Sequence, residues 1–286
     1  MPFGLQGAPG IFQEMMEMLI SKIKSRPEVK PLLKHIHLGA FFDDLGFSTN
    51  LDKDHLTVLE ALLDECAKHK LRIKLSKCEF LLEEMDYLGF HVSYGTWQPS
   101  AKKVEAILKA KVTNLKELQS FLGGMNFFRR HVPKFSESSH ILTDLLKKGT
   151  PWNWTPIHQE KLDELKAKLS QMTQLGTPKC QGEIVLLTDS SDHQGGASIY
   201  QWQQVPNMIL SRLGKSDINK YSTSGVNQDG TLVHNYPSEY CLVPLGHYSW
   251  KWSQARQRYH TYEKELLAGI LTIATQHKIM APLVII

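Results

Sequence analysis

Two stretches near the start of the chain place apolar residues at helical spacing, APGIFQEMMEMLISKIKS and DHLTVLEALLDECAKHK, and each predicts an amphipathic helix. Pro9 stands at the start of the first stretch, where the first helical turn tolerates proline. Between the two, HIHLGAFFDDLGFSTN predicts a buried strand, a tight turn carrying two aspartates and a returning strand. Further on, MDYLGFHVS predicts a short hairpin. The order helix, hairpin, helix, hairpin indicates an α+β arrangement with helices on one face of a sheet.

From Thr113 the pattern becomes helical. Asn114 and Glu117 have the spacing of a capping box at a helix start. The apolar residues that follow line one face as far as Phe128, and Pro133 is expected to close this helix. The turn-rich stretch KKGTPWNWTP then predicts a linker, and HQEKLDELKAKLSQM predicts one more helix.

A new domain is predicted to begin near Cys180. EIVLLTDSS reads as a buried strand with a polar end, GGASIYQWQQ as a returning strand and HYSWKW as a third strand. Residues 204–246 are polar and aperiodic, which predicts a long loop or insertion. TYEKELLAGILTIATQH predicts a helix, and the final APLVII predicts one more strand.

Composition excludes several classes of protein. No apolar run approaches the length of a membrane span, and the N-terminal MPFGLQGAPG lacks the basic and apolar regions of a signal peptide. The four cysteines form no CxxC pair, which argues against a zinc site or a disulfide framework and fits a reducing compartment. We therefore expect an intracellular protein, cytoplasmic or nuclear and not secreted, without a membrane partner.

Positive charge is concentrated in one part of the chain. The net charge is +4, but residues 101–148 alone hold ten Lys and Arg against four Asp and Glu. Such a basic stretch suits a polyanionic partner. Charge alone does not separate this reading from an ordinary solvated helix face.

Asp43 and Asp44 stand side by side after the aromatic pair Phe41 and Phe42. Adjacent carboxylates repel each other, and a bound divalent cation would offset that repulsion. Hard cations such as Mg²⁺ prefer carboxylate oxygens and leave room for substrate phosphates. Taken alone, two acids at a hairpin tip are more often a solvated turn.

Several longer motifs occur in an order that resembles the reverse transcriptase and ribonuclease H region of Ty3/gypsy-type LTR retrotransposons. They run MPFGLQGAPGIFQ, FFDD, KLSKCEF, YLGF, LKELQSFLGGMNFFRRHVPKFS, LTDLLKKGTPWNW, LLTDSSDHQGGA and YHTYEKELLAGI. The resemblance covers nearly the whole chain apart from 204–246. It implies an incomplete reverse-transcriptase palm in residues 1–98, a thumb and connection in 99–179, and a truncated ribonuclease H-like α/β domain in 180–286.

The resemblance also implies roles for individual residues in DNA synthesis. FFDD corresponds to the family's aromatic-x-Asp-Asp hairpin, with Phe41 in place of the usual tyrosine, so that Asp43 and Asp44 would be catalytic carboxylates that bind Mg²⁺ or Mn²⁺. The remaining residues would contact nucleic acid or nucleotide: Gln6 at the template and incoming nucleotide, Lys77 near the phosphates, the primer-gripping hairpin of Tyr87, Leu88, Gly89 and Phe90, and the thumb residues Arg129 and Arg130.

In the C-terminal part the resemblance implies a nuclease site. Asp189 would end the first strand, and Glu265 on the following helix is expected to point toward it, both as catalytic and metal-binding carboxylates. We prefer Glu265 to Glu263 because KELLA matches the family. The alternative for Glu265 is an acidic residue of the first helical turn that is stabilised by the helix dipole and has no catalytic role. His247 and His260 are expected to be structural or solvent-facing.

The expected partners are an RNA or DNA template–primer duplex, an RNA–DNA hybrid, deoxynucleotides and other segments of the same polyprotein. The family also uses an aspartate upstream of MPFGL, a fingers subdomain and a third ribonuclease H carboxylate beyond Ile286, none of which lies in this chain. We therefore expect this polypeptide alone to lack robust polymerase or nuclease activity. One alternative is a catalytically dead nucleic-acid-binding remnant. Another is a protein-interaction scaffold, in which Arg129, Arg130, Lys147 and Lys148 would not affect nucleic-acid retention.

Overall fold

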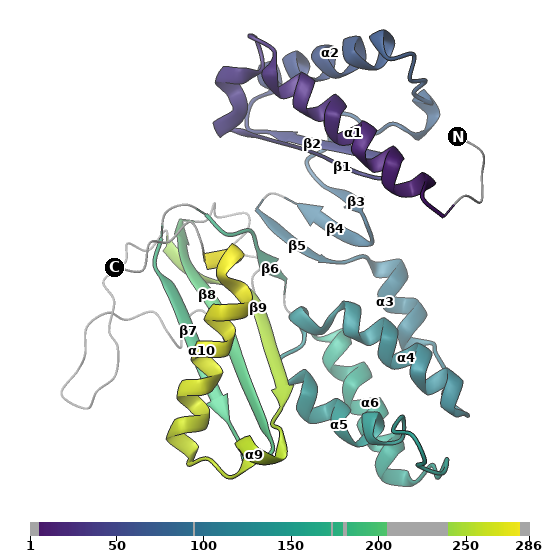
Figure 1. Ribbon diagram of the computed structural model, residues 1–286, viewed down its shortest axis with the longest axis vertical. Helices are drawn as coiled ribbons and strands as arrows, with labels where there is room; N and C mark the ends of the chain where they lie inside the picture. Colours follow the sequence, from purple (N-terminus) through teal and green to yellow (C-terminus); the bar gives the residue numbers. More distant parts are fainter. Residues whose placement is uncertain (1–5, 94, 173, 180–181, 205–239, 281–286) are drawn as a thin grey trace, which may run out of the picture. The chain divides into compact units, whose positions relative to one another are not determined.

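The computed structural model describes residues 6–93, 95–172, 174–179, 182–204 and 240–280, and its contacts divide the chain into two compact units (Figure 1). Unit 1 comprises Met1–Leu82 and unit 2 comprises Glu83–Ile286. These units do not follow the predicted boundaries after residues 98 and 179. The expected palm, thumb and nuclease-like segments therefore remain assignments by resemblance, and each unit is described by itself.

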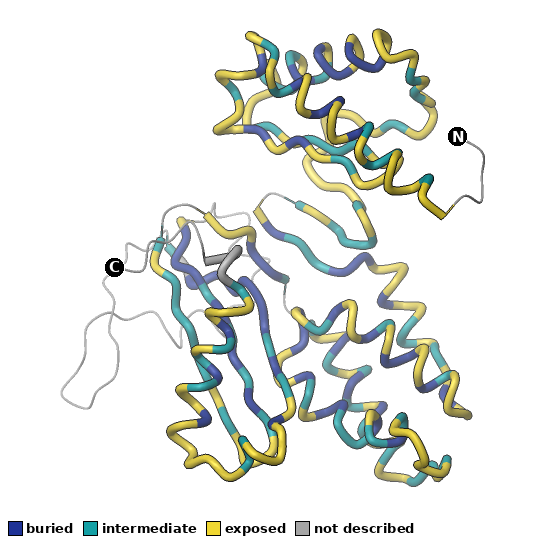
Figure 2. The backbone as a smooth tube through the Cα atoms, viewed as in Figure 1, coloured by how far each residue is buried: buried dark blue, intermediate teal, exposed yellow. Residues whose placement is uncertain are grey.

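Unit 1 is a two-stranded antiparallel ribbon covered by two helices. Helix α1 packs on strand β1 and on helix α2, which also contacts β2. The buried core comes from the apolar stripes of both helices and from the inner residues of β1, as the predicted helix–hairpin–helix order requires (Figure 2). The elements are α1 Ala8–Ser25, η1 Lys30–Lys34, β1 Ile36–Phe41, β2 Asp44–Thr49, α2 Asp52–Lys68 and η2 Leu75–Lys77.

A buried ionic cluster fastens the end of α1 to α2. Glu65 is 6% exposed, and its carboxylate accepts from Arg26 Nε at 3.1 Å and from Lys68 Nζ at 2.9 Å. The guanidinium of Arg26 also reaches Asp64 at 3.3 Å and Glu28 at 3.2 Å. These partners, Lys68 first, hold the pKa of the Glu65 carboxyl below its usual range. The cluster compensates the negative charge of the Glu65 carboxylate, which would be costly to bury without partners.

Unit 2 begins with a four-stranded antiparallel sheet and a helical layer. The predicted MDYLGFHVS hairpin is confirmed as β3 and β4, and β6, which lies much later in the chain, completes the sheet in the order β3-β4-β5-β6. Asn114 caps α4 by accepting from Glu117 N at 3.0 Å, while Glu117 accepts from Thr113 N at 2.7 Å. The elements are β3 Met85–Tyr87, β4 Phe90–Ser93, β5 Thr96–Pro99, α3 Ala101–Leu108, α4 Leu115–Phe127, η3 Arg129–His131, α5 Phe135–Asp144, α6 Pro156–Ser170 and β6 Leu175–Gly176.

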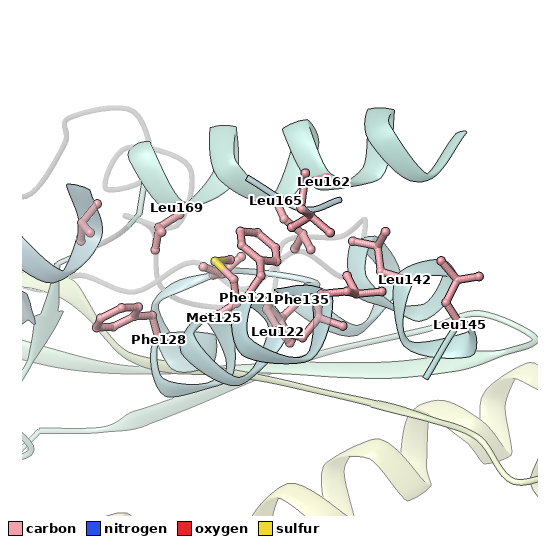
Figure 3. Close-up of a cluster of buried hydrophobic side chains, with 14 residues drawn as sticks. Phe121, Leu122, Met125, Phe128, Phe135, Leu142, Leu145, Leu162, Leu165 and Leu169 are labelled. Carbon is pink, nitrogen blue, oxygen red and sulfur yellow. The ribbon is translucent and has the colours of Figure 1, made fainter. Parts of the chain in front are cut away.

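The helices of this layer share one apolar core (Figure 3). It forms because α4, α5 and α6 each turn one stripe of leucine, phenylalanine or methionine inward. Helix α4 ends at Phe127, ahead of Pro133, and the short η3 turn fills the interval. The buried side chains labelled in Figure 3 are Phe121, Leu122, Met125, Phe128, Phe135, Leu142, Leu145, Leu162, Leu165 and Leu169.

The rest of unit 2 is a three-stranded antiparallel sheet, β7-β8-β9, with helix α10 packed on it. All three predicted strands and the helix are confirmed. The predicted irregular stretch 204–246 is wrong at its end, because β9 begins at Tyr240; residues 205–239 and APLVII at 281–286 lie outside the described residues. The elements are β7 Ile184–Ser190, β8 Gln194–Gln204, β9 Tyr240–Lys251, α9 Gln254–Gln257 and α10 Thr261–Met280.

The two faces of this sheet have different neighbours. A Cβ on Gly269 of α10 would lie 3.8 Å from both Leu186 and Thr188, so α10 covers the face on which these two β7 side chains point. On strand β9, Arg129 Nη2 donates to Ser249 O at 2.5 Å and Ser136 N donates to Ser249 Oγ at 2.9 Å. The helical layer is thus bonded to the sheet within unit 2. None of the described helices combines the length and apolar character needed to cross a bilayer.

His247 on β9 makes unit 2 sensitive to acid. Its side chain is buried, its Nδ1 lies 2.8 Å from Ser198 Oγ, and burial together with nearby His131 lowers its pKa to about 4. In the unfolded chain its pKa is about 6.5, so the unfolded state binds more protons between these values and stability falls as the pH drops through that window. We expect unit 2 to lose roughly 2 kcal/mol from this group between pH 7.5 and pH 5.

Denaturant unfolding at several pH values checks this expectation. Replacing His247 with glutamine, which does not titrate, should flatten the slope between pH 7.5 and pH 5. An unaltered slope in the His247→Gln variant would contradict the assignment.

Candidate functional site

The acidic doublet lies at the tip of the β1–β2 hairpin. Phe42 and Asp43 form the two-residue connection, and Asp44 is the first residue of β2, paired with Phe41. Both carboxylates are exposed, as predicted for a turn. The aromatic pair is not buried, however: Phe41 is 50% and Phe42 39% exposed, because burial along β1 fades toward its outer end. The hairpin therefore presents two acids and two phenyl rings together on its surface.

Gln13 of α1 fixes the shape of this tip. Its Oε1 accepts from Phe42 N at 2.7 Å, and its Nε2 donates to Ala40 O at 3.2 Å. Phe42 has φ of +53°, a left-handed conformation that a phenylalanine rarely adopts, and the hydrogen bond to its N–H helps to hold it there. Sequence reasoning missed this role, although Gln13 is the last residue of the MPFGLQGAPGIFQ motif.

Replacing Gln13 with leucine is expected to loosen the acidic hairpin. Two hydrogen bonds to the backbone disappear, so the tip should open more often and the amide of Phe42 should exchange with solvent about tenfold faster. Hydrogen exchange measured residue by residue tests this. Gln13 also donates to Glu17 at 3.1 Å, so Glu17→Leu is the control that removes only that bond. Equal exchange rates of the Phe42 amide in Gln13→Leu and in the wild type would show that Gln13 does not hold the hairpin tip.

Gln6 and Lys77, the other predicted contacts in unit 1, are both exposed. Gln6 lies in the turn immediately before α1, and Lys77 is the last residue of η2. Their contact with template or nucleotide stays a prediction, because nothing in the described residues assigns them a ligand.

The hairpin of Tyr87, Leu88, Gly89 and Phe90 belongs to unit 2. Leu88 and Gly89 both have positive φ, 50° and 84°, so the turn twists in the sense that suits a two-residue hairpin. The ring of Phe90 stacks on Phe127 with centroids 4.7 Å apart, and Lys103 Nζ lies 4.4 Å from the centroid of Phe127 on α4. Glycine suits this position because its φ of +84° is a conformation that residues with a Cβ rarely adopt. The hairpin is firmly seated on the helical layer.

The two thumb arginines have partners within unit 2. Arg129 donates to Ser249 O, and Arg130 Nη2 donates to Gln276 Oε1 at 3.3 Å. Both arginines therefore have a structural role within unit 2, in addition to their predicted contact with nucleic acid. Several other basic residues of the 101–148 stretch are exposed and form no ion pair within the part of the chain that the structure describes: Lys102, Lys111, Lys116 and Lys148.

The two predicted nuclease carboxylates do not face each other. Asp189 is the last residue but one of β7 and points, by strand alternation from Thr188, away from the face that α10 covers. Glu265 is exposed on α10, and the prediction that its side chain points toward the strand is wrong. The inward stripe of α10 is Lys264, Ala268 and Thr272, with Lys264 Nζ 2.9 Å from Asp192 Oδ1. The neighbouring lysine therefore occupies the position expected of Glu265.

Asp189 instead forms an ion pair with the helical layer. Lys134, the residue before α5, places its Nζ 2.6 Å from Asp189 Oδ2. Both side chains remain more than half exposed, at 59% and 64%.

The carboxylates have the right chemistry for a hard divalent cation but are too few in one place to hold it. Carboxylate oxygens are the ligands that Mg²⁺ and Mn²⁺ prefer, and Asp43 and Asp44 offer two exposed groups at one tip. Among the described residues, however, no group of three or more His, Cys, Asp or Glu side chains gathers where a metal ion would bind. Additional ligands are needed to fix an ion at either site.

Comparison with protein families gives two matches. Residues 1–92 match the family described as "Reverse transcriptase (RNA-dependent DNA polymerase)", and residues 154–227 match the "RNase H-like domain found in reverse transcriptase". Among curated proteins, the Transposon Tf2-3 and Tf2-4 polyproteins of Schizosaccharomyces pombe are 28% identical over 274 residues. The alignment covers 96% of this chain but only 17% of each polyprotein.

Solved structures with the same fold come from a foamy virus. One is the protease-reverse transcriptase dRH in complex with double-stranded DNA, at 21% identity and a TM-score of 0.73, covering 97% of this chain and 41% of that one. Another is the protease-reverse transcriptase in complex with an RNA/DNA hybrid, at 20% identity and a TM-score of 0.68, covering 98% of this chain and 32% of that one. At this identity the likeness concerns the fold.

Proposed function

We propose that this chain, in which residues 1–92 match the reverse transcriptase family and residues 154–227 match the RNase H-like domain found in reverse transcriptase, is the duplex-holding part of a retrotransposon polyprotein. The predicted family and α+β fold class are confirmed. The proposed reactions of the larger protein are template-directed DNA synthesis and cleavage of RNA in RNA–DNA hybrids. The observation that carries this proposal is the exposed acidic doublet on a hairpin whose tip Gln13 holds.

Asp43 and Asp44 are the proposed metal-binding carboxylates of the synthesis reaction. The families that match are divalent-metal dependent, and a bound Mg²⁺ or Mn²⁺ would stabilise the charge that develops on phosphate oxygens. Gln13 holds the backbone of the hairpin tip that carries these carboxylates, and the Tyr87–Phe90 hairpin, seated on Phe127, is proposed to grip the primer end. Asp189 and Glu265 are proposed ligands of the nuclease site. Because the two carboxylates do not face each other, binding one ion would require that their side chains rearrange or that further residues supply ligands.

We also propose that this chain alone does not sustain either reaction, because no cluster of three ligands forms among its described residues. Primer extension on an RNA template with Mg²⁺ or Mn²⁺ tests this. The expected result is no incorporation above background. Clear incorporation that Asp43→Asn abolishes would overturn the proposed inactivity and would establish Asp43 as a catalytic carboxylate.

A second candidate function is duplex binding without catalysis. It is favoured by the exposed lysines of the helical layer, which are available for phosphate contacts. Binding of a labelled RNA–DNA hybrid should then weaken steeply as salt rises from 50 to 200 mM. A Lys111→Gln/Lys116→Gln variant should have a shallower dependence on salt. The matched control is Lys53→Gln/Lys70→Gln in unit 1, which removes the same charge. Affinity that is independent of salt would count against duplex binding through phosphate contacts.

A further inference from the structure

Residues 177–179 lead from the sheet that carries the Tyr87–Phe90 hairpin toward the β7-β8-β9 sheet, and all three are exposed to solvent. They follow β6, a strand of two residues that pairs with Thr96 and Trp97 of β5 and also contacts β9 (Figure 1). Exposed connections are usually mobile because few contacts hold them. This one is bonded to a sheet on each of its two sides.

Thr177 joins the two sheets through its own backbone. Its N–H donates to Gly95 O at 2.8 Å, next to β5. Its C=O accepts from the side chain of Gln203, a residue of β8, with a distance of 2.9 Å from Nε2. Just ahead of β6, Gln174 Nε2 donates to Thr96 Oγ1 at 2.7 Å and strengthens the attachment to the first sheet. The attachment to the second sheet comes from glutamine side chains.

Gln201 of β8 binds the same connection two residues further on. Its Oε1 accepts from Lys179 N and its Nε2 donates to Lys179 O, both at 2.9 Å, so its amide group bonds this residue as a neighbouring strand would. Gln201 also donates to Gly182 O at 3.1 Å and accepts from Gln203 Nε2 at 2.9 Å. Gly182 has φ of +110°, and a Cβ there would collide with the backbone carbonyl of Trp202. The connection therefore approaches the backbone of β8 closely.

Burial makes these hydrogen bonds persistent. Gln201 is 0% and Gln203 3% exposed, and a buried amide group that loses its partners destabilises the protein. The ion pair between Lys134 and Asp189, which also reaches the β7-β8-β9 sheet, is more than half exposed on both sides, and exposed pairs contribute little. The two glutamines are thus a stronger attachment than this ion pair.

We propose that Gln201 and Gln203 form a glutamine bridge, which couples the β3-β4-β5-β6 sheet to the β7-β8-β9 sheet by holding residues 177–179 between them. The bridge goes beyond the function proposed above. Its consequence for that function is that the hairpin proposed to grip a primer does not move independently of the nuclease-like sheet. Opening the bridge frees residues 177–179 and leaves the two-residue β6 to its short pairing with β5.

Limited digestion with trypsin tests the bridge at Lys179. The carbonyl of the peptide bond that trypsin would cut after Lys179 is the one that Gln201 binds. Gln201→Met keeps most of the side-chain volume and removes both hydrogen bonds to Lys179, so cleavage after Lys179 should become on the order of tenfold faster. Cleavage after the exposed Lys148 is the internal reference for general loosening. Gln254→Met is the matched control, since it makes the same change at an exposed position of α9.

Amide hydrogen exchange of Thr177 tests the coupling between the sheets. Gln203→Met removes only the donor to Thr177 O and leaves the bond from Thr177 N to Gly95 O in place. If the bridge holds the connection against β5, the Thr177 N–H should nevertheless exchange about fivefold faster in this variant. The amide of Glu117, which Asn114 caps in the helical layer, should be unaffected. Because Gln203→Met alters one amide group, this measurement does not depend on how well Gln201→Met folds.

The outcomes decide the proposal without nucleic acid. Faster cleavage after Lys179 alone in Gln201→Met, faster exchange of Thr177 in Gln203→Met and no change in Gln254→Met support it. Equal cleavage after Lys179 in Gln201→Met and the wild type, or an equal increase after Lys179 and Lys148, overturns the bridge. Unchanged exchange of Thr177 in Gln203→Met overturns the coupling. Failure of the protein to bind a duplex would refute the proposed function and leave these results as they are.

Discussion

Replacing Phe128 with alanine is expected to lower the free energy of unfolding of unit 2 by about 3–5 kcal/mol, because it removes a buried aromatic ring from a closely packed core. The side chain is 1% exposed and lies within the apolar core of the helical layer (Figure 3). Its ring also meets Phe90 edge to face with centroids 6.3 Å apart. A cavity at this point would loosen both α4 and the hairpin that carries Phe90. Hydrogen exchange of the α4–α6 amides, together with denaturant unfolding, measures the loss.

The adjacent residue provides a matched control for this substitution. Phe127 is 45% exposed and stacks on Phe90 without entering the core. Phe127→Ala removes the same side chain but leaves no buried cavity, so its cost should be about 1 kcal/mol. Losses of similar size in the two variants would show that burial in this core does not decide stability.

Breaking the buried ion pair in unit 1 is expected to cost about 3 kcal/mol. Arg26→Met leaves the carboxylate of Glu65, which is 6% exposed, without its guanidinium partner, and a buried charge without full compensation is strongly destabilising. The lower end of the usual range applies because Lys68 still lies 2.9 Å from Glu65. Since α1 carries Gln13, the acidic hairpin should open more readily in this variant.

A double-mutant cycle separates the energy of the Arg26–Glu65 ion pair from the other effects of each substitution. Glu65→Leu alone should also be destabilising, because it leaves Arg26 half compensated by the more exposed Asp64 and Glu28. The double variant, Arg26→Met with Glu65→Leu, should lose clearly less than the sum of the two single losses. Denaturant unfolding of all four proteins gives the coupling. Simple additivity would show that the ion pair does not hold α1 against α2.

Local elements could be predicted from the sequence because each depends on neighbouring residues. The tight turn of the first hairpin, the short second hairpin, the N-cap at Asn114 and the helices α1, α2 and α6 follow from short patterns, and the structure contains all of them. The acidic doublet was correctly placed at a hairpin tip for the same reason. The burial of its aromatic neighbours was misjudged, because periodicity identifies a strand but not how far along it the covering helix extends.

Contacts between distant segments could not be predicted from the sequence. Helical spacing separates the directions of Lys264 and Glu265 by about 100°, and only the packing of α10 on β7 shows that Lys264 is the one that turns inward. The ion pair between Lys134 and Asp189 joins two segments that are far apart in the sequence. The return of β6 to the sheet of β3, β4 and β5 explains why residues 99–179 do not separate from what precedes them as a compact unit of their own.

The β1–β2 ribbon has a consequence for the behaviour of unit 1. It is a two-stranded sheet, and among the described residues no third strand pairs with either of its outer edges. Each such edge offers backbone N–H and C=O groups that another extended segment can join. The ribbon that displays the acidic doublet therefore also offers, in unit 1, an edge with which another extended segment can pair.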